Sequence, residues 1–320
     1  MKKILLLMSF FLLPYNVLAY SEYIIPGGQT LGIKVDTSGI MIIGFYKING
    51  NYNKGSKELK VGDYIQKING IKIDNLETMT SVIEQSIENK KINVSFVRNN
   101  KEYETILPLI YSDKKYKTGL FVKDSIKGIG TLSYIDPETK IFGALGHEIE
   151  DTSTHSIVEI KSGSIFRNMI TGIDKSMPGV AGSKLAKFDY EIKYGKILKN
   201  TPYGIFGIYD GNYLNNKALK ISENIKLGDA YFQTVLENEK IEKYNIEITA
   251  LNKNSNIKNI TFKITDEKVL NKTGGVVQGM SGSPIIQNDE LVGVITHVIV
   301  DNPTTGYGIL ITTMLQEGEK

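Results

Sequence analysis

The chain contains no cysteine and no tryptophan, and only three of its 320 residues are histidine. Without cysteine, disulfides, thiolate zinc sites and a cysteine nucleophile are all excluded. A strong excess of one charge is also absent, because the net charge is +3 and the lysines are spread along the chain. The sequence therefore shows no basic stripe of the kind that predicts a nucleic-acid partner.

Long apolar runs are absent except at the N-terminus. Two lysines precede the run Ile4 to Leu13, and Val17-Leu18-Ala19 has the form of a signal-peptidase site. The run is about half the roughly 20 residues that a membrane-spanning helix needs. Residues 1–19 therefore predict a signal peptide cleaved after Ala19, with an uncleaved membrane anchor as the alternative. In both cases the remaining chain is exported.

Residues 23–110 show the pattern of short strands around one helix. Asn69-Gly70 lies between apolar runs and predicts a two-residue hairpin. Residues Leu76 to Ile87 carry apolar side chains at helical spacing. The segment is therefore expected to be a small α+β domain.

This segment resembles a PDZ domain. The resemblance rests on Leu59-x-x-Gly62-Asp63-x-Ile65-x-x-Ile68-Asn69-Gly70 and, more loosely, on Leu31, Gly32 and Ile33. It implies that a peptide C-terminus, or a segment of the chain itself, adds as a strand beside Ile33 to Val35. Backbone N–H groups near Leu31 and Gly32 would hold the peptide carboxylate. The alternative is a PDZ fold that acts only as a spacer or an intramolecular clamp.

Residues 118–320 read as a mainly β region, separated from the PDZ-like segment by a polar linker at 111–117. Short strand-like runs punctuated by glycine recur throughout, such as Gly204-Ile205-Phe206-Gly207-Ile208-Tyr209. Regularly spaced short strands predict a barrel or a sandwich. About 200 residues are enough for two small barrels.

The most specific motif in this region is Gly279-Met280-Ser281-Gly282-Ser283-Pro284. It has the G-x-S-G-x-P form found around the nucleophile of chymotrypsin-like serine peptidases. Glycine permits a tight turn with unusual φ values. Such a turn directs the backbone N–H groups of Gly279 and Ser281 at one point, where they form an oxyanion hole. Ser281 is therefore the predicted nucleophile.

A serine hydroxyl needs a base to take its proton, and three histidines are available. His147 follows a strand and has small neighbours, which leave an imidazole accessible at a cleft. His155 lies in a polar stretch typical of a surface loop. His297 lies within a strand near Ser281, where a structural role or a place in the substrate cleft is expected. We predict His147 as the base.

The third member should be a carboxylate that orients the base. Spacing alone does not select one, because Asp174, Asp189, Asp210 and Asp266 all lie in the same region.

The two catalytic segments resemble those of the stage IV sporulation protein B peptidase family. The resemblance rests on Phe142-Gly143-Ala144-Leu145-Gly146-His147 and on the run from Thr273 to Gln287. It continues through Thr296-His297-Val298 and Gly306-Tyr307-Gly308-Ile309. The resemblance implies a mainly β chain, in which a PDZ domain precedes a chymotrypsin-like double β-barrel. It also implies His147 as base, Ser281 as nucleophile and Asp266 as the acid, with no cofactor or metal.

The family resemblance also implies a biological role. Such enzymes are exported into the space between the two forespore membranes. There they cleave a membrane-bound regulator of an intramembrane protease, which activates a late sigma factor. The family further implies release by self-cleavage near the N-terminus, although in this chain the PDZ-like segment starts almost directly after the apolar run.

Three rival functions follow from the same residues. An inactive PDZ adaptor would carry the fold without the chemistry. A zinc enzyme is disfavoured because His147 and His155 are not four residues apart, as a zinc-binding helix requires. A serine esterase is disfavoured because the motif lacks the Gly-x-Ser-x-Gly form of a strand-to-helix elbow.

Overall fold

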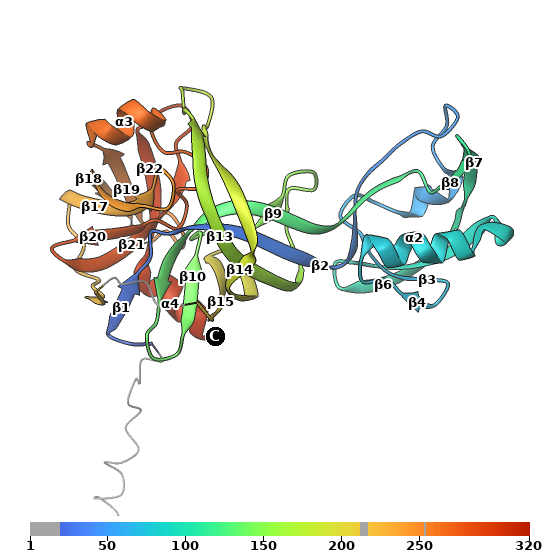
Figure 1. The fold of residues 1–320 in the computed structure, drawn as a ribbon, viewed down its shortest axis with the longest axis horizontal. Coiled ribbons are helices and arrows are strands. Elements are labelled where there is room, and N and C mark those ends of the chain that lie inside the picture. Colours follow the sequence, from blue (N-terminus) through green and yellow to red (C-terminus); the bar gives the residue numbers. More distant parts are fainter. Residues whose placement is uncertain (1–19, 212–216, 253) are drawn as a thin grey trace, which may run out of the picture.

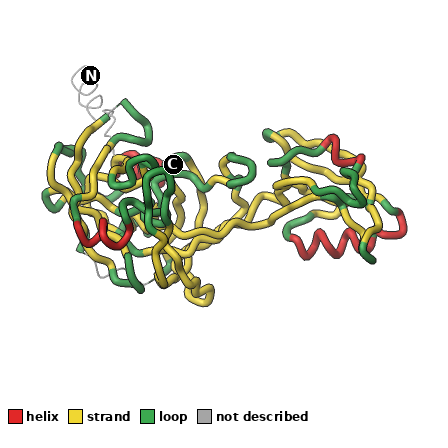
Figure 2. The backbone as a smooth tube through the Cα atoms, turned by 90° about the horizontal axis from the view of Figure 1, so that it is seen from above, coloured by secondary structure: helices red, strands yellow, loops and turns green. Residues whose placement is uncertain are grey.

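The computed structural model describes residues 20–211, 217–252 and 254–320, so the predicted signal segment lies outside the described residues. Two β-barrels lie against each other at one end, and a smaller module stands apart from them (Figure 1). The view from above shows the same separation, with strands running between the two parts (Figure 2).

The first barrel is a ring of six antiparallel strands. The ring runs β2-β9-β10-β15-β14-β13, and the pairing of β2 with β9 closes it. A core of aliphatic side chains fills it, including Leu31, Val35, Leu132 and Ile165. The strands are β2 (Thr30–Phe45), β9 (Leu120–Ile135), β10 (Ile141–Ala144), β13 (Ile160–Asp174), β14 (Ser183–Thr201) and β15 (Gly204–Tyr209).

The second barrel is also a closed ring of six strands, in the order β17-β18-β19-β22-β21-β20. Counted within each barrel, both rings follow the strand order 1-2-3-6-5-4. Two such rings side by side confirm the predicted chymotrypsin-like double barrel. The strands are β17 (Gly228–Val235), β18 (Ile241–Leu251), β19 (Ile260–Ile264), β20 (Pro284–Gln287), β21 (Glu290–Val298) and β22 (Thr305–Leu310).

Short elements cover the seam between the barrels. Helix α4 (Ile311–Glu319) buries Met314 and Leu315 in a cluster that also contains Tyr134 of the first barrel and Val294 of the second. The part of the seam under α4 is therefore an apolar core shared by both barrels. The other short elements around the barrels are β1 (Tyr23–Pro26), β11 (Glu150–Asp151), β12 (Ser156–Ile157), β16 (Leu219–Lys220) and α3 (Glu267–Thr273).

The small module has its own apolar core, built from residues between Ile40 and Leu120. The predicted helix is present as α2 (Leu76–Gln85), and the predicted hairpin turn has left-handed Asn69 and Gly70, at φ 51° and 79°. The remaining elements are η2 (Lys54–Glu58), β3 (Tyr64–Ile68), β4 (Ile71–Lys72), η3 (Ile87–Asn89), β5 (Lys91–Arg98), β6 (Lys101–Pro108), β7 (Ile110–Ser112) and β8 (Lys115–Lys117).

The module is inserted into the first barrel, which differs from the predicted order of a domain at 23–110 followed by a peptidase. Strands β2 and β9 each span 16 residues and belong to both parts. Within β2, residues Thr30–Asp36 pair inside the barrel, whereas Ile40 and Met41 pair with β3 of the module. The first strand of the barrel therefore precedes the module, and the predicted boundary at residue 23 is corrected. The predicted linker at 111–117 is corrected too, because β7 and β8 pair there as a hairpin.

The prediction of Leu31, Gly32 and Ile33 as a peptide-binding edge is wrong for the same reason. On one side these residues pair with β13, opposite Arg167 to Ile165, and on the other with β9, opposite Gly130 to Gly128. Both backbone edges are occupied, so no further strand can add there.

Candidate active site

The nucleophile motif forms a tight turn between α3 and β20. Gly279 and Gly282 have φ values of +92° and +99°, which glycine adopts without strain. A Cβ atom at Gly282 would lie 1.9 Å from the carbonyl oxygen of Thr131, so space as well as φ requires glycine. The Ser283 hydroxyl donates to the carbonyl of Met280, which closes the turn from within.

The turn leaves two backbone donors available. Among the described residues, the N–H groups of Gly279 and Ser281 make no hydrogen bond, whereas the N–H groups of Gln278, Met280 and Gly282 each have a backbone acceptor. The predicted oxyanion-hole pair is therefore free to bind a developing negative charge.

The Ser281 side chain is in a resting arrangement. Its hydroxyl donates a hydrogen bond of 2.7 Å to the carbonyl oxygen of Thr296 on β21. For catalysis it must rotate away from this acceptor and donate to a base.

Thr131 of β9 connects the nucleophile turn to the loop that carries His147. Its N–H donates to Ser281 O at 2.9 Å, and its hydroxyl donates to Gly279 O at 2.7 Å. Its carbonyl accepts from the N–H of Leu145, two residues before His147. Thr131 was missed by the sequence reasoning, because nothing in its local pattern shows these distant partners.

His147 follows β10, the third strand of the first barrel, on a turn with left-handed Leu145 and Gly146. Its Nδ1 lies 2.7 Å from the carbonyl oxygen of Glu148. A carbonyl can only accept, so this bond requires the hydrogen on Nδ1. The neutral ring then presents Nε2 as an acceptor, which is the tautomer that a general base needs.

His147 and Ser281 line one cavity of about 590 Å³, where the two barrels meet. Much of its wall is aliphatic, with Ile129, Leu145, Val276 and Val298 among the lining residues, and Glu148 and Glu150 supply negative charge beside His147. The barrels thus bring the predicted nucleophile and base to the same cavity from distant parts of the sequence.

The two other histidines differ in environment. His297 lines the same cavity, and its ring centroid lies 5.2 Å from that of His147. Burial, with a smaller effect of neighbouring His147, lowers the pKa of His297 to about 4, so its ring is neutral near pH 7. His155 is exposed in the β11–β12 turn, as predicted for a surface residue.

Asp266 does not meet His147, contrary to the prediction that it is the triad acid. One oxygen of its carboxylate accepts from the N–H groups of Lys268 and Val269, and the other accepts from the N–H of Asn245. It is the N-cap of α3, and it is not among the residues that line the cavity. The group that orients His147 in this structure is instead the Glu148 carbonyl.

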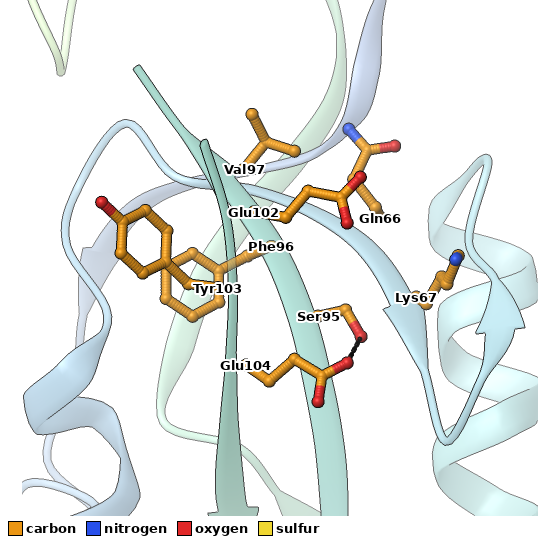
Figure 3. A pocket seen from close by; sticks show the side chains of 8 residues that line it. All are labelled: Gln66, Lys67, Ser95, Phe96, Val97, Glu102, Tyr103 and Glu104. Carbon is orange, nitrogen blue, oxygen red and sulfur yellow. Dashed lines mark hydrogen bonds between the residues drawn. The ribbon is translucent and has the colours of Figure 1, made fainter. Parts of the chain in front are cut away.

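A second depression lies on the small module, and no histidine lines it. It is lined by side chains of β3, β5 and β6, including the stacked rings of Phe96 and Tyr103, with Ser95 donating to Glu104 (Figure 3). A serine and a carboxylate are therefore present here, but among the described residues His147 and the paired free N–H groups lie at the cavity between the barrels.

Comparison with known proteins agrees with this geometry. The family model described as SpoIVB peptidase S55 matches residues 114–315, well over half of the chain. The chain belongs to this peptidase family. It is therefore a serine peptidase, a hydrolase of peptide bonds, and the match contains both Ser281 and His147.

Two other comparisons add little to the S55 assignment. Among solved structures, the chain is similar to the Rv3671c protease of M. tuberculosis H37Rv in an inactive form and to an inactive-form mutant of it. Both matches have 14% identity and a TM-score of 0.31, and cover 59% of this chain and 81% of that one. That likeness is too low to carry an argument about the site. No curated protein matches the chain.

The S55 site can perform acyl transfer with the groups described. Once rotated, the Ser281 Oγ would attack the scissile carbonyl while His147 Nε2 took its proton. The resulting oxyanion accepts from the N–H groups of Gly279 and Ser281. The imidazolium then gives its proton to the leaving amine, and a water molecule, activated by the same ring, hydrolyses the acyl-enzyme.

The acid limit of this peptidase activity should lie below pH 6.5. Burial is the largest influence on His147 and lowers its pKa, outweighing the backbone hydrogen bond and the charges of Glu148 and Glu150, which raise it. Only the neutral ring accepts a proton, so kcat/KM should fall as pH drops through this lowered pKa. A pH profile with its acid midpoint above 6.5 would contradict this.

Replacing Asp266 separates helix capping from catalysis. Asparagine is also a good N-cap and loses only the bond from the Asn245 N–H, so we expect Asp266→Asn to keep near-normal turnover with a small loss of stability. Asp266→Ala should lose about 1 kcal/mol of unfolding free energy. A fall of about 10⁴-fold in kcat for Asp266→Asn, measured with a peptide substrate, would restore Asp266 as the triad acid.

Proposed function

We propose that this peptidase is a sporulation enzyme that cleaves a membrane-bound regulator of an intramembrane protease, and so triggers activation of a late sigma factor. The observation that carries the proposal is the SpoIVB family match over residues 114–315, with its nucleophile and base in one cavity. The substrate side chains next to the cleaved bond are expected to be apolar, because the cavity wall is largely aliphatic.

The proposed location is the space between the forespore membranes. The support is the exported N-terminus predicted from residues 1–19. Within the part of the chain that the structure describes, no helix is long and apolar enough to cross a membrane. If residues 1–19 stay uncleaved, their apolar run is the proposed membrane tether. Self-cleavage near this end belongs to the same proposal.

For the small module we propose peptide binding at a different edge from the one expected. On β9, residues Leu120–Lys123 pair with β2 on one side, and no strand among the described residues pairs with the other side. Helix α2 begins nearby, because the N–H of Leu76 donates to Asp124. Gly119, at φ +80°, turns the chain into this strand. A strand-like peptide fits such an edge.

Photo-crosslinking tests this edge in the Ser281→Ala protein, which cannot degrade the probe. C-terminal peptides carrying a photoreactive group should attach to residues 117–124. Attachment at Leu31, Gly32 or Ile33 would contradict the pairing that closes the first barrel. The absence of any attachment would favour a module that serves only as a spacer or a clamp.

The sporulation role is tested in the source cell. The chromosomal gene is replaced by wild-type, Ser281→Ala or Ser112→Ala alleles, and a reporter of the late sigma factor is followed. The expected result is normal reporter activity for wild type and for Ser112→Ala, a change in the small module, and loss for Ser281→Ala. Full reporter activity with Ser281→Ala would favour the rival role, a non-catalytic adaptor.

Self-cleavage is tested in vitro with the purified chain. Wild-type protein should produce N-terminal fragments on incubation, and Ser281→Ala protein should stay intact, as followed by mass spectrometry. Identical fragments from both proteins would assign the cleavage to another peptidase.

A further inference from the structure

Lys184 is a buried lysine at the seam of the two barrels, directly behind the nucleophile turn. Only 3% of its surface is exposed, and among the described residues no acidic side chain pairs with it. Burying an ammonium without a counter-charge costs free energy, so a lysine at this position indicates a role other than stabilising the fold.

The ammonium of Lys184 is held by one hydroxyl from each barrel. Its Nζ lies 3.3 Å from Thr30 Oγ1 on β2 of the first barrel, and 2.9 Å from Thr234 Oγ1 on β17 of the second. These are neutral partners, and burial lowers the pKa of Lys184 to about 7. The side chain therefore joins the two barrels by hydrogen bonds rather than by an ion pair.

The same residue contacts the turn that carries the oxyanion donors. Its backbone N–H donates to Gln278 O at 2.9 Å. A Cβ atom placed on Gly279 would lie 3.1 Å from Lys184 Cδ, so the lysine stem packs against the back of this glycine. On the other side, the Thr131 hydroxyl holds Gly279 O, and Thr131 is the pairing partner of Thr30. Gly279 is thus fixed from both sides.

We propose that Lys184 is a positioning residue of the peptidase: it ties the two barrels together behind Gly279 and so holds the Gly279 N–H in the oxyanion hole. Lys184 is not among the residues that line the cavity, so it does not act as the base. The inference rests on the peptidase activity alone and not on the sporulation role.

Substitution by methionine tests the proposal, because methionine keeps the stem and removes the ammonium. The rate of covalent labelling of the full chain by a fluorophosphonate probe is resolved into kinact and KI. We expect kinact to fall about 100-fold, as for a misplaced catalytic group, with KI unchanged. The midpoint of urea unfolding should change little, because removing a buried amine without a counter-charge offsets the loss of a partner for the buried Thr30 and Thr234 hydroxyls.

Lys187→Met is the matched control, since Lys187 is an exposed lysine on the same strand. It should change neither kinact nor the unfolding midpoint. Wild-type kinact in Lys184→Met would overturn the proposal. A fall of both kinact and the unfolding midpoint in Lys184→Met would also overturn the proposal, because it would indicate a purely structural role. A loss as complete as that of Ser281→Ala would overturn it too, because it indicates proton transfer.

Thr234→Val provides a second route if Lys184→Met does not fold. It removes only the hydroxyl contributed by the second barrel, so kinact should fall less than in Lys184→Met, again at unchanged KI. In the double variant the two losses should not add, since both remove the same contact. Wild-type kinact in Thr234→Val, or fully additive losses, would contradict the proposal. If the fluorophosphonate probe did not label the wild-type protein, the result would instead contradict the assignment of peptidase activity.

Discussion

Ser281→Ala should abolish peptide turnover, reducing kcat by about 10⁴-fold or more. The hydroxyl is the only group in the turn that can form the acyl-enzyme, since Ser283 is buried and donates to Met280 O. Removing the hydroxyl leaves the oxyanion donors in place, so only weak residual catalysis should remain. The measurement is hydrolysis of a fluorogenic peptide at saturating concentration.

The control for this experiment is Ser112→Ala, at a serine whose hydroxyl bonds to Asn49 in the small module. It should retain wild-type kcat and KM. Ser281→Ala should stay folded and lose no more than about 1 kcal/mol of unfolding free energy, the contribution of the hydrogen bond to Thr296 O. Turnover that survives in folded Ser281→Ala protein would remove Ser281 from the mechanism.

His147→Ala should reduce kcat by about 10⁴-fold, and the residual activity should lose the acid limb of the pH profile. The ring is the group whose Nδ1 is fixed by a carbonyl, leaving Nε2 to accept a proton. The reaction should be followed with the same fluorogenic peptide between pH 4 and pH 9.

The comparison variants are His297→Ala and His155→Ala. His297→Ala should cause a much smaller loss, because this neutral ring packs against His147 without a partner for its Nδ1 among the described residues. His155→Ala should leave kcat unchanged, because that side chain is exposed. If His297→Ala abolished turnover while His147→Ala did not, the assignment of the base would be reversed.

The nucleophile turn was predictable because its requirements are local. The six residues of the motif contain two glycines at positive φ, a serine between them and a proline that begins the next strand. The hairpin at Asn69-Gly70 and the helix α2 were predictable for the same reason. Each rests on backbone preferences and apolar spacing that neighbouring residues decide.

The place of Leu31, Gly32 and Ile33 was not predictable from local pattern. Their β-strand character was clear, but a strand pattern does not say which strands flank it. The answer depends on Gly128 to Gly130 and on Ile165 to Arg167, more than 90 positions away along the chain. Only this pairing shows that the barrel is interrupted by the small module.

Asp266 was assigned by resemblance, while its local sequence carried another signal. An aspartate before Glu267-Lys268-Val269-Leu270, with Gly274 after the apolar residues, is a helix start followed by a helix stop. The helix has only seven residues, which is too short for clear periodicity. The Asp266 carboxylate therefore caps the helix. The group that contacts His147 is the backbone carbonyl of Glu148, and no side-chain motif predicts a backbone contact.

Mapping of the covalent adduct tests the central assignment most directly. The wild-type protein is treated with a fluorophosphonate probe near pH 7, digested, and sequenced by mass spectrometry. We expect one adduct per chain, on Ser281, and no adduct in His147→Ala over the same time. An adduct on a different residue, or equal labelling of Ser281 without His147, would contradict it.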